Sequence, residues 1–362
     1  MADRLHVATR KGLFELVRGH GTWEVGEVQF LGDPVSAVLA EADGTVYAAL
    51  DLGHFGAKLW RHDPAGAWGE LAGARVPAKA GRGGRRSSSL VARQDLGARN
   101  GPRRRAAVGR DDARRALPLG RWRPILVAQR GAVAHARAPA VVGGRGRRAA
   151  RHRLRIGRPE QPRRHPRRRV DRGVWASTDT GSSWRNINHG MYAEYMPPEL
   201  REEPIAQDVH RLARCAAHPE IVWCQHHNGV FRSQDAGATW HELTAIRPSK
   251  FGFAVAAHPR DPDTAWFIPA VKDERRIPVD GKVVVARTRD GGRSFEVLRK
   301  GLPQHHAYDL VWRHALAIDA SGERLAFGST SGGLWIAEDG GDSWTMPEAR
   351  LPPIAAVRFA AS

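Results

Sequence analysis

Ionisable side chains gather in a few polar segments of the second half of the chain. These segments cover residues 188–211, 225–228, 272–281, 302–309 and 327–333, and residues 8–12 and 51–56 add to them from the first half. Two carboxyl groups placed around a glycosidic bond can serve as acid and base, or as acid and nucleophile. The candidate catalytic residues are therefore the carboxylates of these segments and one phenol: Glu194, Asp208, Asp273, Glu274, Tyr308 and Asp309.

Basic, imidazole and phenol side chains accompany these carboxylates. The candidate ligand-binding residues are Arg10, Lys11, Tyr195, His210, His226, His227, Lys272, Arg276, His306, Arg313 and His314. Such groups donate hydrogen bonds to carboxylates and hydroxyls, so together they predict a polar pocket for a sugar or another anionic, hydroxyl-rich ligand. The competing interpretation is that they solvate loops and tie neighbouring elements together. We favour that role for any single residue, and a binding site for the set.

Four of the histidines have a second possible use as metal ligands. Imidazoles brought together from different loops suit zinc or copper, and the candidates are His210, His226, His227 and His306. Their sequence spacing does not establish a site, so we expect hydrogen-bonded histidines with no metal and no cofactor. The sequence lacks a Gly-rich phosphate loop, a nucleophile elbow and a Cys-x-x-Cys pair. Nucleotide-binding, serine-hydrolase and zinc-ribbon classes are therefore disfavoured.

The elements that must position these residues are visible as a repeat. Four segments share one pattern: GVWASTDTGSSW (173–184), GVFRSQDAGATW (229–240), VARTRDGGRSF (285–295) and GLWIAEDGGDSW (333–344). Their aspartates, Asp179, Asp235, Asp290 and Asp339, are 56, 55 and 49 residues apart. This period is typical of one four-stranded blade with its loops. The sequence therefore predicts an all-β fold, a β-propeller.

We interpret the four repeated aspartates as structural. A short carboxylate can accept hydrogen bonds from turn amides, and the glycine two residues later permits a positive φ. The aromatic residue that follows can cover the edge of the blade. We therefore expect turn formation, and not acid catalysis, from these aspartates.

Each blade reads as strand, turn, strand, loop, strand, aspartate turn and strand. The loops between the second and third strands, and the connections between blades, fall on one face, where the candidate residues converge on the mouth of a central channel. Weaker copies of the pattern occupy residues 11–23 and 58–68, which indicates seven blades by design. We expect residues 353–360 to close the ring against the first strand and remove an exposed edge.

An arginine-rich block, residues 80–172, interrupts the repeat where one blade and part of the next are due. Residues 81–172 hold 28 arginines, no lysine and five acidic residues, a net charge of +23, whereas the whole chain carries +19. This bias is typical of GC-rich coding sequence read in a shifted frame. A one-base shift permits residues 108–134 to encode LWAGTMPGGLFRSDGGDRSWSLNEALW, which resembles the missing blade. We interpret the block as a frameshifted, poorly packed segment between propeller residues 1–79 and 173–362.

Composition outside this block is that of an ordinary folded protein. Because its excess charge lies in the block, the basic balance does not indicate a nucleic-acid partner. The sequence has no apolar run near 18 residues, and its first residues lack the apolar region of a secretory signal. We expect a cytoplasmic protein with no membrane segment and no disulfide, since Cys215 and Cys224 are the only cysteines.

The repeat resembles that of the Asp-box, BNR-repeat propellers of the sialidase-like and glycosyl-hydrolase-like family, a class with WD40/YVTN-like repeats. The resemblance covers roughly residues 1–78 and 173–362, and it implies glycan binding or glycoside hydrolysis at the channel mouth. True sialidases carry an arginine triad, a tyrosine nucleophile and an early Arg-Ile-Pro motif. Here Arg276-Ile277-Pro278 occurs late in the chain, and no arginine triad can be named. The alternative is a non-enzymatic propeller that serves as a scaffold for protein assembly.

Overall fold

A computed structural model describes residues 2–71, the backbone of 125–128, 173–177 and 183–360. Apart from that short strand, the arginine-rich block 80–172 lies outside the described residues, and so does Asp179. The expected frameshifted character of the block therefore remains a prediction. In the described ranges no helix is long and apolar enough to cross a bilayer.

Three four-stranded sheets and one three-stranded sheet follow one another along the chain, and every neighbouring pair within them is antiparallel. Their strands are β4 (Val35–Ala40), β5 (Val46–Asp51), β6 (Ala57–His62), β7 (Trp68–Glu70); β8 (Ile125–Ala128), β9 (Gly173–Ala176), β10 (Arg185–Asn186); β11 (Val209–Arg214), β12 (Val222–His226), β13 (Val230–Ser233), β14 (His241–Glu242); and β15 (Gly252–Ala257), β16 (Ala265–Pro269), β17 (Val285–Thr288), β18 (Glu296–Leu298).

The remaining strands form one seven-stranded sheet that joins the two ends of the chain. They are β1 (Arg4–Thr9), β2 (Gly12–Gly19), β3 (Thr22–Gln29), β19 (Val311–Ile318), β20 (Leu325–Ser329), β21 (Leu334–Ala337) and β22 (Ile354–Phe359). A single parallel bridge, His314 to Ala356, connects β19 to β22. The sheet is thus two blades side by side: one is β19–β21, and the other is β22 with β1–β3. We call the second the ring-closing blade, because its strand β22 pairs antiparallel with β1.

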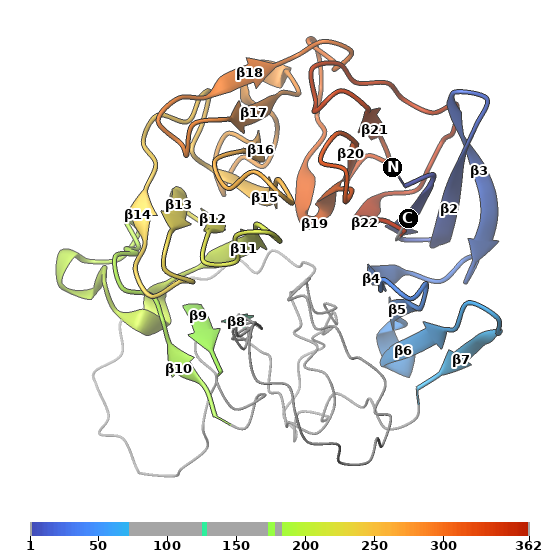
Figure 1. Cartoon of the computed structure of the whole chain (residues 1–362), viewed down its shortest axis with the longest axis horizontal. Helices are drawn as coiled ribbons and strands as arrows, with labels where there is room; N and C mark the ends of the chain where they lie inside the picture. Colours follow the sequence, from blue (N-terminus) through green and yellow to red (C-terminus); the bar gives the residue numbers. More distant parts are fainter. Residues whose placement is uncertain (1, 72–124, 129–172, 178–182, 361–362) are drawn as a thin grey trace, which may run out of the picture.

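The sheets stand around a common centre like the blades of a propeller (Figure 1). The innermost strands are β4, β11, β15, β19 and β22. In the described part of the chain, short 3-10 helices occur only in connections: η1 (Gly53–Phe55), η2 (Pro198–Leu200), η3 (Pro204–Ala206) and η4 (Val279–Gly281). The predicted all-β propeller class is confirmed. The seven-blade count stays a prediction.

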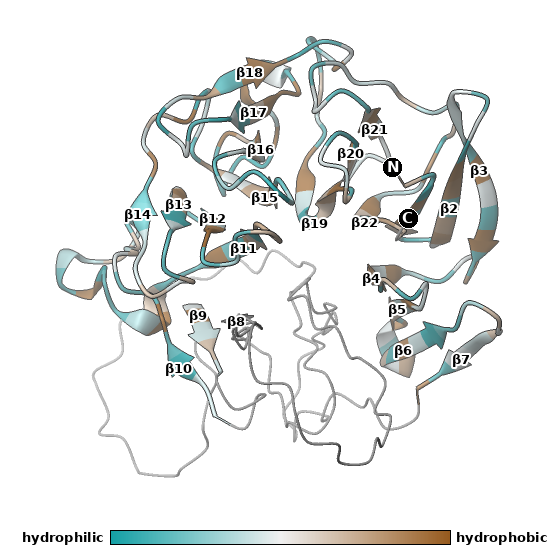
Figure 2. Cartoon of the chain, in the orientation of Figure 1, coloured by the Kyte–Doolittle hydropathy of each residue, from teal (hydrophilic) through white to brown (hydrophobic). Residues whose placement is uncertain are grey.

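Hydrophobic side chains fill the spaces between consecutive blades. The largest fully buried side chains include Trp223 of β12, Trp266 of β16 and Trp335 of β21, together with Trp240, which directly precedes β14. Figure 2 shows hydrophobic residues along the inner strands, whereas the outermost strands β10 and β14 are hydrophilic. Burying these aromatic side chains stabilises the fold by about 25 cal/mol per Å² of apolar surface removed from water. Packing between neighbouring blades therefore holds the circle of blades together.

The aspartate turns share one hydrogen-bond pattern. Asp235 accepts from the backbone N–H of Thr239 at 2.8 Å and from its hydroxyl at 2.6 Å. Asp290 accepts from the same two groups of Ser294, at 3.0 and 2.6 Å. Asp339 accepts from Ser343 in the same way, at 3.0 and 2.5 Å. These carboxylates satisfy turn donors, which is a structural use of their charge.

Glycine is required two residues after each of these aspartates. Gly237, Gly292 and Gly341 adopt φ values of 91°, 92° and 94°. A side chain at such a φ is strained. The turn therefore holds its conformation through the preceding carboxylate and the backbone freedom of glycine.

The aromatic residue after each turn packs on the preceding blade. Trp240 donates from its backbone N–H to His189 O at 2.9 Å and from its indole N–H to Ile187 O at 2.8 Å. Trp344 donates from its backbone N–H to Lys300 O at 3.0 Å. These two tryptophans thus couple their own blades to the preceding ones.

Candidate functional site

We call the face on which the candidate residues were expected to meet the mouth. It includes the ends of β11 and β12 and the connections beside them. Asp208 precedes β11 and His227 follows β12, so the antiparallel pairing of these strands places the two residues opposite each other. The backbone N–H of His227 donates to Asp208 O at 2.9 Å. The Nδ1 atom of His227 lies 3.6 Å from Asp208 Oδ2, close enough for an ion pair when the ring is protonated.

His210 lies beside this pair in a buried, aromatic environment. Its ring stacks on Phe253 with centroids 4.5 Å apart, and its Nδ1 lies 2.6 Å from Gly252 O. Because a carbonyl oxygen only accepts, Nδ1 carries the proton and Nε2 keeps a lone pair. Burial holds the pKa of His210 well below its ordinary value, and the positive charge of Arg313 lowers it further. His210 is therefore neutral.

Asp208, His210 and His227 are the candidate residues that converge most closely. One oxygen or nitrogen atom from each lies within 4.8 Å of the corresponding atoms of the other two. Two imidazoles and one carboxylate are ligand types that transition metals accept. Among the described residues these are the ones that could hold an ion.

Aromatic side chains surround the three residues. The ring of Tyr195 lies 4.8 Å from that of His227, and Phe251 lies 5.7 Å from the same ring. Tyr195 is 42% exposed, so its ring is accessible at the surface. The Arg276 guanidinium lies over the Phe253 ring at 5.4 Å, a cation–π contact that places its charge near the mouth.

The other predicted catalytic carboxylates also have partners. Asp273 pairs with Arg276, and Glu274 lies 3.7 Å from Lys272. The pKa of Glu274 is lowered, chiefly by a backbone hydrogen bond and then by the Lys272 charge, with a smaller contribution from His227. Glu194 pairs with Lys250 at 2.6 Å, and Asp309 accepts a hydrogen bond from Ser329 at 2.7 Å.

An arginine cluster lies along the innermost strands just below the mouth. Arg211 donates to Nδ1 of His314, and Arg358 donates to the backbone oxygen of His314 at 3.3 Å. Arg313 lies over the Phe253 ring at 5.2 Å. Burial lowers the pKa of His314 well below its usual value, and the charges of Arg211, Arg358 and Arg313 lower it further. These three arginines are called the arginine cluster below.

Sequence reasoning missed two members of this cluster, Arg211 and Arg358. It also missed Asp51, whose pKa is raised because burial disfavours its charged form. The sequence does contain a signal for the two arginines, because each is a charged residue within an innermost strand. Side chains alternate along a strand, so such a residue faces the centre of the ring of blades when it does not face the core. Asp51 ends β5 at the mouth side of its blade, where a polar loop was expected.

Several predicted site residues do not join the converging group. His226 is fully buried, its ring lies 5.5 Å from that of Phe231, and its pKa is lowered to about 3, mainly by burial. Tyr308 is exposed, and His306 stands in a loop with φ of 50°. Arg10 and Lys11 form the turn between β1 and β2 in the ring-closing blade.

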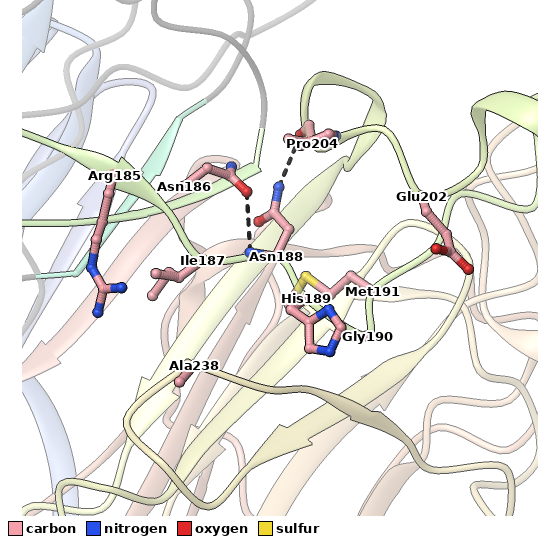
Figure 3. Close-up of a pocket in the computed structure, with 10 residues that line it drawn as sticks. All are labelled: Arg185, Asn186, Ile187, Asn188, His189, Gly190, Met191, Glu202, Pro204 and Ala238. Atoms are coloured by element: carbon pink, nitrogen blue, oxygen red, sulfur yellow. Dashed lines mark hydrogen bonds between the residues drawn. The ribbon is translucent and has the colours of Figure 1, made fainter.

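A pocket lies away from these residues, in the connection after β10 (Figure 3). Its volume is about 310 Å³, and Asn188 spans it by donating to Pro204 O at 2.9 Å. The residues that line it are Arg185, Asn186, Ile187, Asn188, His189, Gly190, Met191, Glu202, Pro204 and Ala238. None of the predicted site residues belongs to this lining.

No protein-family model matches the chain, and neither does any curated protein sequence. Solved structures of three kinds are similar to it. An ancestral GH74 enzyme shares 15% identity over 48% of this chain, with a TM-score of 0.36, and the chain spans 21% of that enzyme. YCF48 bound to D1 peptide shares 11% over 96% of this chain and 78% of its own, with a TM-score of 0.36. A chain of the COPII outer coat vertex on membranes shares 8% over 91% of this chain and 72% of its own, with a TM-score of 0.40.

Proposed function

We propose that the chain is a sialidase-like, BNR-repeat propeller that binds an anionic, glycan-like ligand at the mouth of its channel. The observation that carries the proposal is the arginine cluster around His314. Guanidinium groups pair with carboxylates through parallel hydrogen bonds. Tyr195 adds a flat apolar ring at the surface, and the carboxylates at the mouth can accept hydrogen bonds from the hydroxyls of a ligand. Both are features of a small-ligand site.

Glycoside hydrolysis is the stronger form of this proposal. It requires two carboxyl groups about 5 to 10 Å apart. Asp208 and Glu274 are the candidates, because both lie near His227. Asp208 contacts the His227 ring at 3.6 Å, and the charge of Glu274 interacts with that ring. Fluorogenic sialosides and neutral glycosides, tested with wild type, Glu274→Gln and Asp208→Asn, measure this activity directly.

Ligand binding is tested by calorimetry with N-acetylneuraminic acid, with galactose as the neutral control sugar. Removing one charged hydrogen bond costs about 1.5 to 3 kcal/mol, so Arg313→Gln should weaken binding of the acid sugar about tenfold or more. Arg289→Gln is the matched control, because Arg289 is exposed on an aspartate turn at the opposite face and contacts Asp342 at 3.8 Å. If wild type binds neither sugar, or both variants weaken binding equally, the proposal is wrong.

A scaffold function has support from the connection between β10 and β11. Tyr195, Leu200 and Ile205 are 42%, 40% and 54% exposed within this one segment. The segment is tied to itself, since Gln207 Nε2 donates to Arg201 O at 2.8 Å and to Glu203 O at 3.0 Å. A firmly held loop with exposed apolar side chains suits peptide contact.

The scaffold function is measured by selecting binders from a displayed peptide library. Peptides enriched on wild type should lose binding to the double variant Leu200→Ser, Ile205→Ser. They should keep binding to Leu31→Ser, which removes an apolar side chain that is 79% exposed in another blade. Equal binding to both variants would exclude this segment as the contact surface.

A further inference from the structure

We propose that Asp208, His210 and His227 bind one divalent transition-metal ion at the mouth of the channel, whether or not a glycan binds there. Their ligand atoms lie within 4.8 Å of one another. Ligands of tetrahedral zinc are about 2.0 to 2.2 Å from the metal, and so about 3.4 Å from each other. Because the contacts with Gly252 and Phe253 hold the His210 ring, the proposal requires the Asp208 and His227 side chains to turn toward it.

The backbone already fixes the relative positions of the three residues. Asp208 and His210 flank the first residue of β11, and His227 directly follows β12, its antiparallel partner. The hydrogen bond from His227 N to Asp208 O, 2.9 Å long, joins the two strand ends. Ligands carried on paired strands are held more firmly than ligands on a free loop.

The hydrogen bond of His210 gives independent support. A histidine that binds a metal commonly donates its other ring N–H to a carbonyl or carboxylate, and this contact orients the ring. His210 makes that contact through Nδ1 to Gly252 O at 2.6 Å, which leaves Nε2 as the ligand atom. Stacking on Phe253 at 4.5 Å restricts the ring further.

The surroundings also suit a bound cation. Phe251 and Tyr195 contact the His227 ring, at 5.7 and 4.8 Å, and an apolar shell of this kind limits access of water to the ion. Two nearby charges act in opposite directions. The negative charge of Glu274 interacts with His227 and favours a cation, whereas the positive charge of Arg313 acts on His210 and opposes one.

The ligand set determines which ions fit. Calcium and magnesium prefer sites made of oxygen atoms. Two imidazoles and one carboxylate suit zinc, iron(II), cobalt(II) or nickel(II) and leave coordination positions open for water or a ligand oxygen. Coordination would also hold the Asp208 carboxylate deprotonated, so the loaded protein could not use Asp208 as a proton donor.

The experiment uses tag-free, full-length protein stripped with a chelator and titrated with zinc or cobalt(II) in the absence of glycan. We expect one ion per chain, with cobalt absorption bands typical of bound imidazole. His227→Ala and Asp208→Asn should each weaken binding about a hundredfold or more. The control is His218→Ala, because His218 pairs with Glu220 at 3.5 Å on the same blade without a third ligand.

Folding of each variant is checked by its melting temperature without metal. Zinc should raise the melting temperature of wild type and of His218→Ala, because an ion that binds only the folded state stabilises it. It should leave that of folded His227→Ala unchanged. The proposal fails if wild type binds no stoichiometric ion, or if both ligand variants bind as wild type does. Either result leaves the glycan proposal standing, since no sugar is present in this test.

Discussion

Arg18 and Glu338, 320 residues apart in sequence, form a fork-shaped ion pair with contacts of 2.6 Å (Nε to Oε1) and 2.8 Å (Nη2 to Oε2). The pair joins β2 of the ring-closing blade to the turn after β21 of its neighbour. Trp23 adds a 3.1 Å hydrogen bond to the same carboxylate. The Arg18 hydrogen bond is the main reason that the pKa of Glu338 is lowered. The contact therefore links the ring-closing blade to the blade β19–β21.

Replacing this carboxylate should weaken the link between the two blades. Glu338→Gln keeps the size of the side chain but removes its charge, and both partners are part-exposed. We expect a loss of about 1 to 2 kcal/mol in the free energy of unfolding, measured by urea denaturation. Glu24→Gln on β3 serves as the control, and an equal loss there would contradict the assigned role.

The aspartate turn should be sensitive to loss of its carboxylate. Asp235→Ala removes the acceptor of two bonds from Thr239 and one from Ser233. We expect a loss of about 1 to 2 kcal/mol in unfolding free energy, with Asp235→Asn intermediate because it keeps one oxygen. Asp33→Ala, on an exposed turn, should change stability little. No loss in Asp235→Ala would show that the glycines alone hold the turn.

The glycine that meets Trp344 should not tolerate a side chain. Gly301 has φ of 81°, and a Cβ atom there would collide with the backbone oxygen of Trp344. Gly301→Ala should lower the unfolding free energy by more than about 1 kcal/mol. Gly69→Ala is the control, because a Cβ there meets nothing within 4 Å. Equal melting temperatures for the two variants would contradict this packing.

Acid should destabilise the ring-closing blade through His6. Burial is the main cause that lowers the pKa of His6 from 6.5 to about 4, and the Arg4 charge adds to it. The folded state favours the neutral ring, so this contribution is complete above pH 6.5 and is lost as the pH falls toward 4. Between pH 7 and 4.5, wild type should lose about 2 kcal/mol more than His6→Gln does. Parallel pH profiles of the two proteins would contradict the assignment.

The fold class could be predicted from the sequence because each blade repeats one local turn pattern. The carboxylate, the glycine two residues later and the aromatic residue after it lie within a dozen residues, so the pattern is readable without tertiary information. The turn of Asp235 shows this directly, since its side chain bonds to Ser233 and Thr239, both within four residues of it. The blade count depends on residues 80–172, which show no such pattern in sequence and lie mostly outside the described part of the chain.

The site was harder to predict because it depends on strand pairing within one blade and on contacts between blades. The sequence indicated Asp208, His210 and His227 as polar loop residues, but their proximity depends on the register of β11 with β12. His226 differs from His227 by one position and points into the core. Strand alternation decides which of two adjacent histidines is exposed, and the end of β12 was not fixed by any sequence signal. Arg211 reaches His314 from another blade, a contact invisible in local spacing.

Because β22 pairs with β1, the sheet that contains β1 can be completed only late in synthesis. The hydrogen-bonding edge that β1 presents is satisfied by residues 354–359, which leave the ribosome long after β1 does. Throughout translation the nascent N-terminal sheet must keep an open edge away from other chains, and only the final strand relieves that exposure. Truncation before β22 would thus yield a protein prone to edge-to-edge association, even with the channel-mouth residues still present.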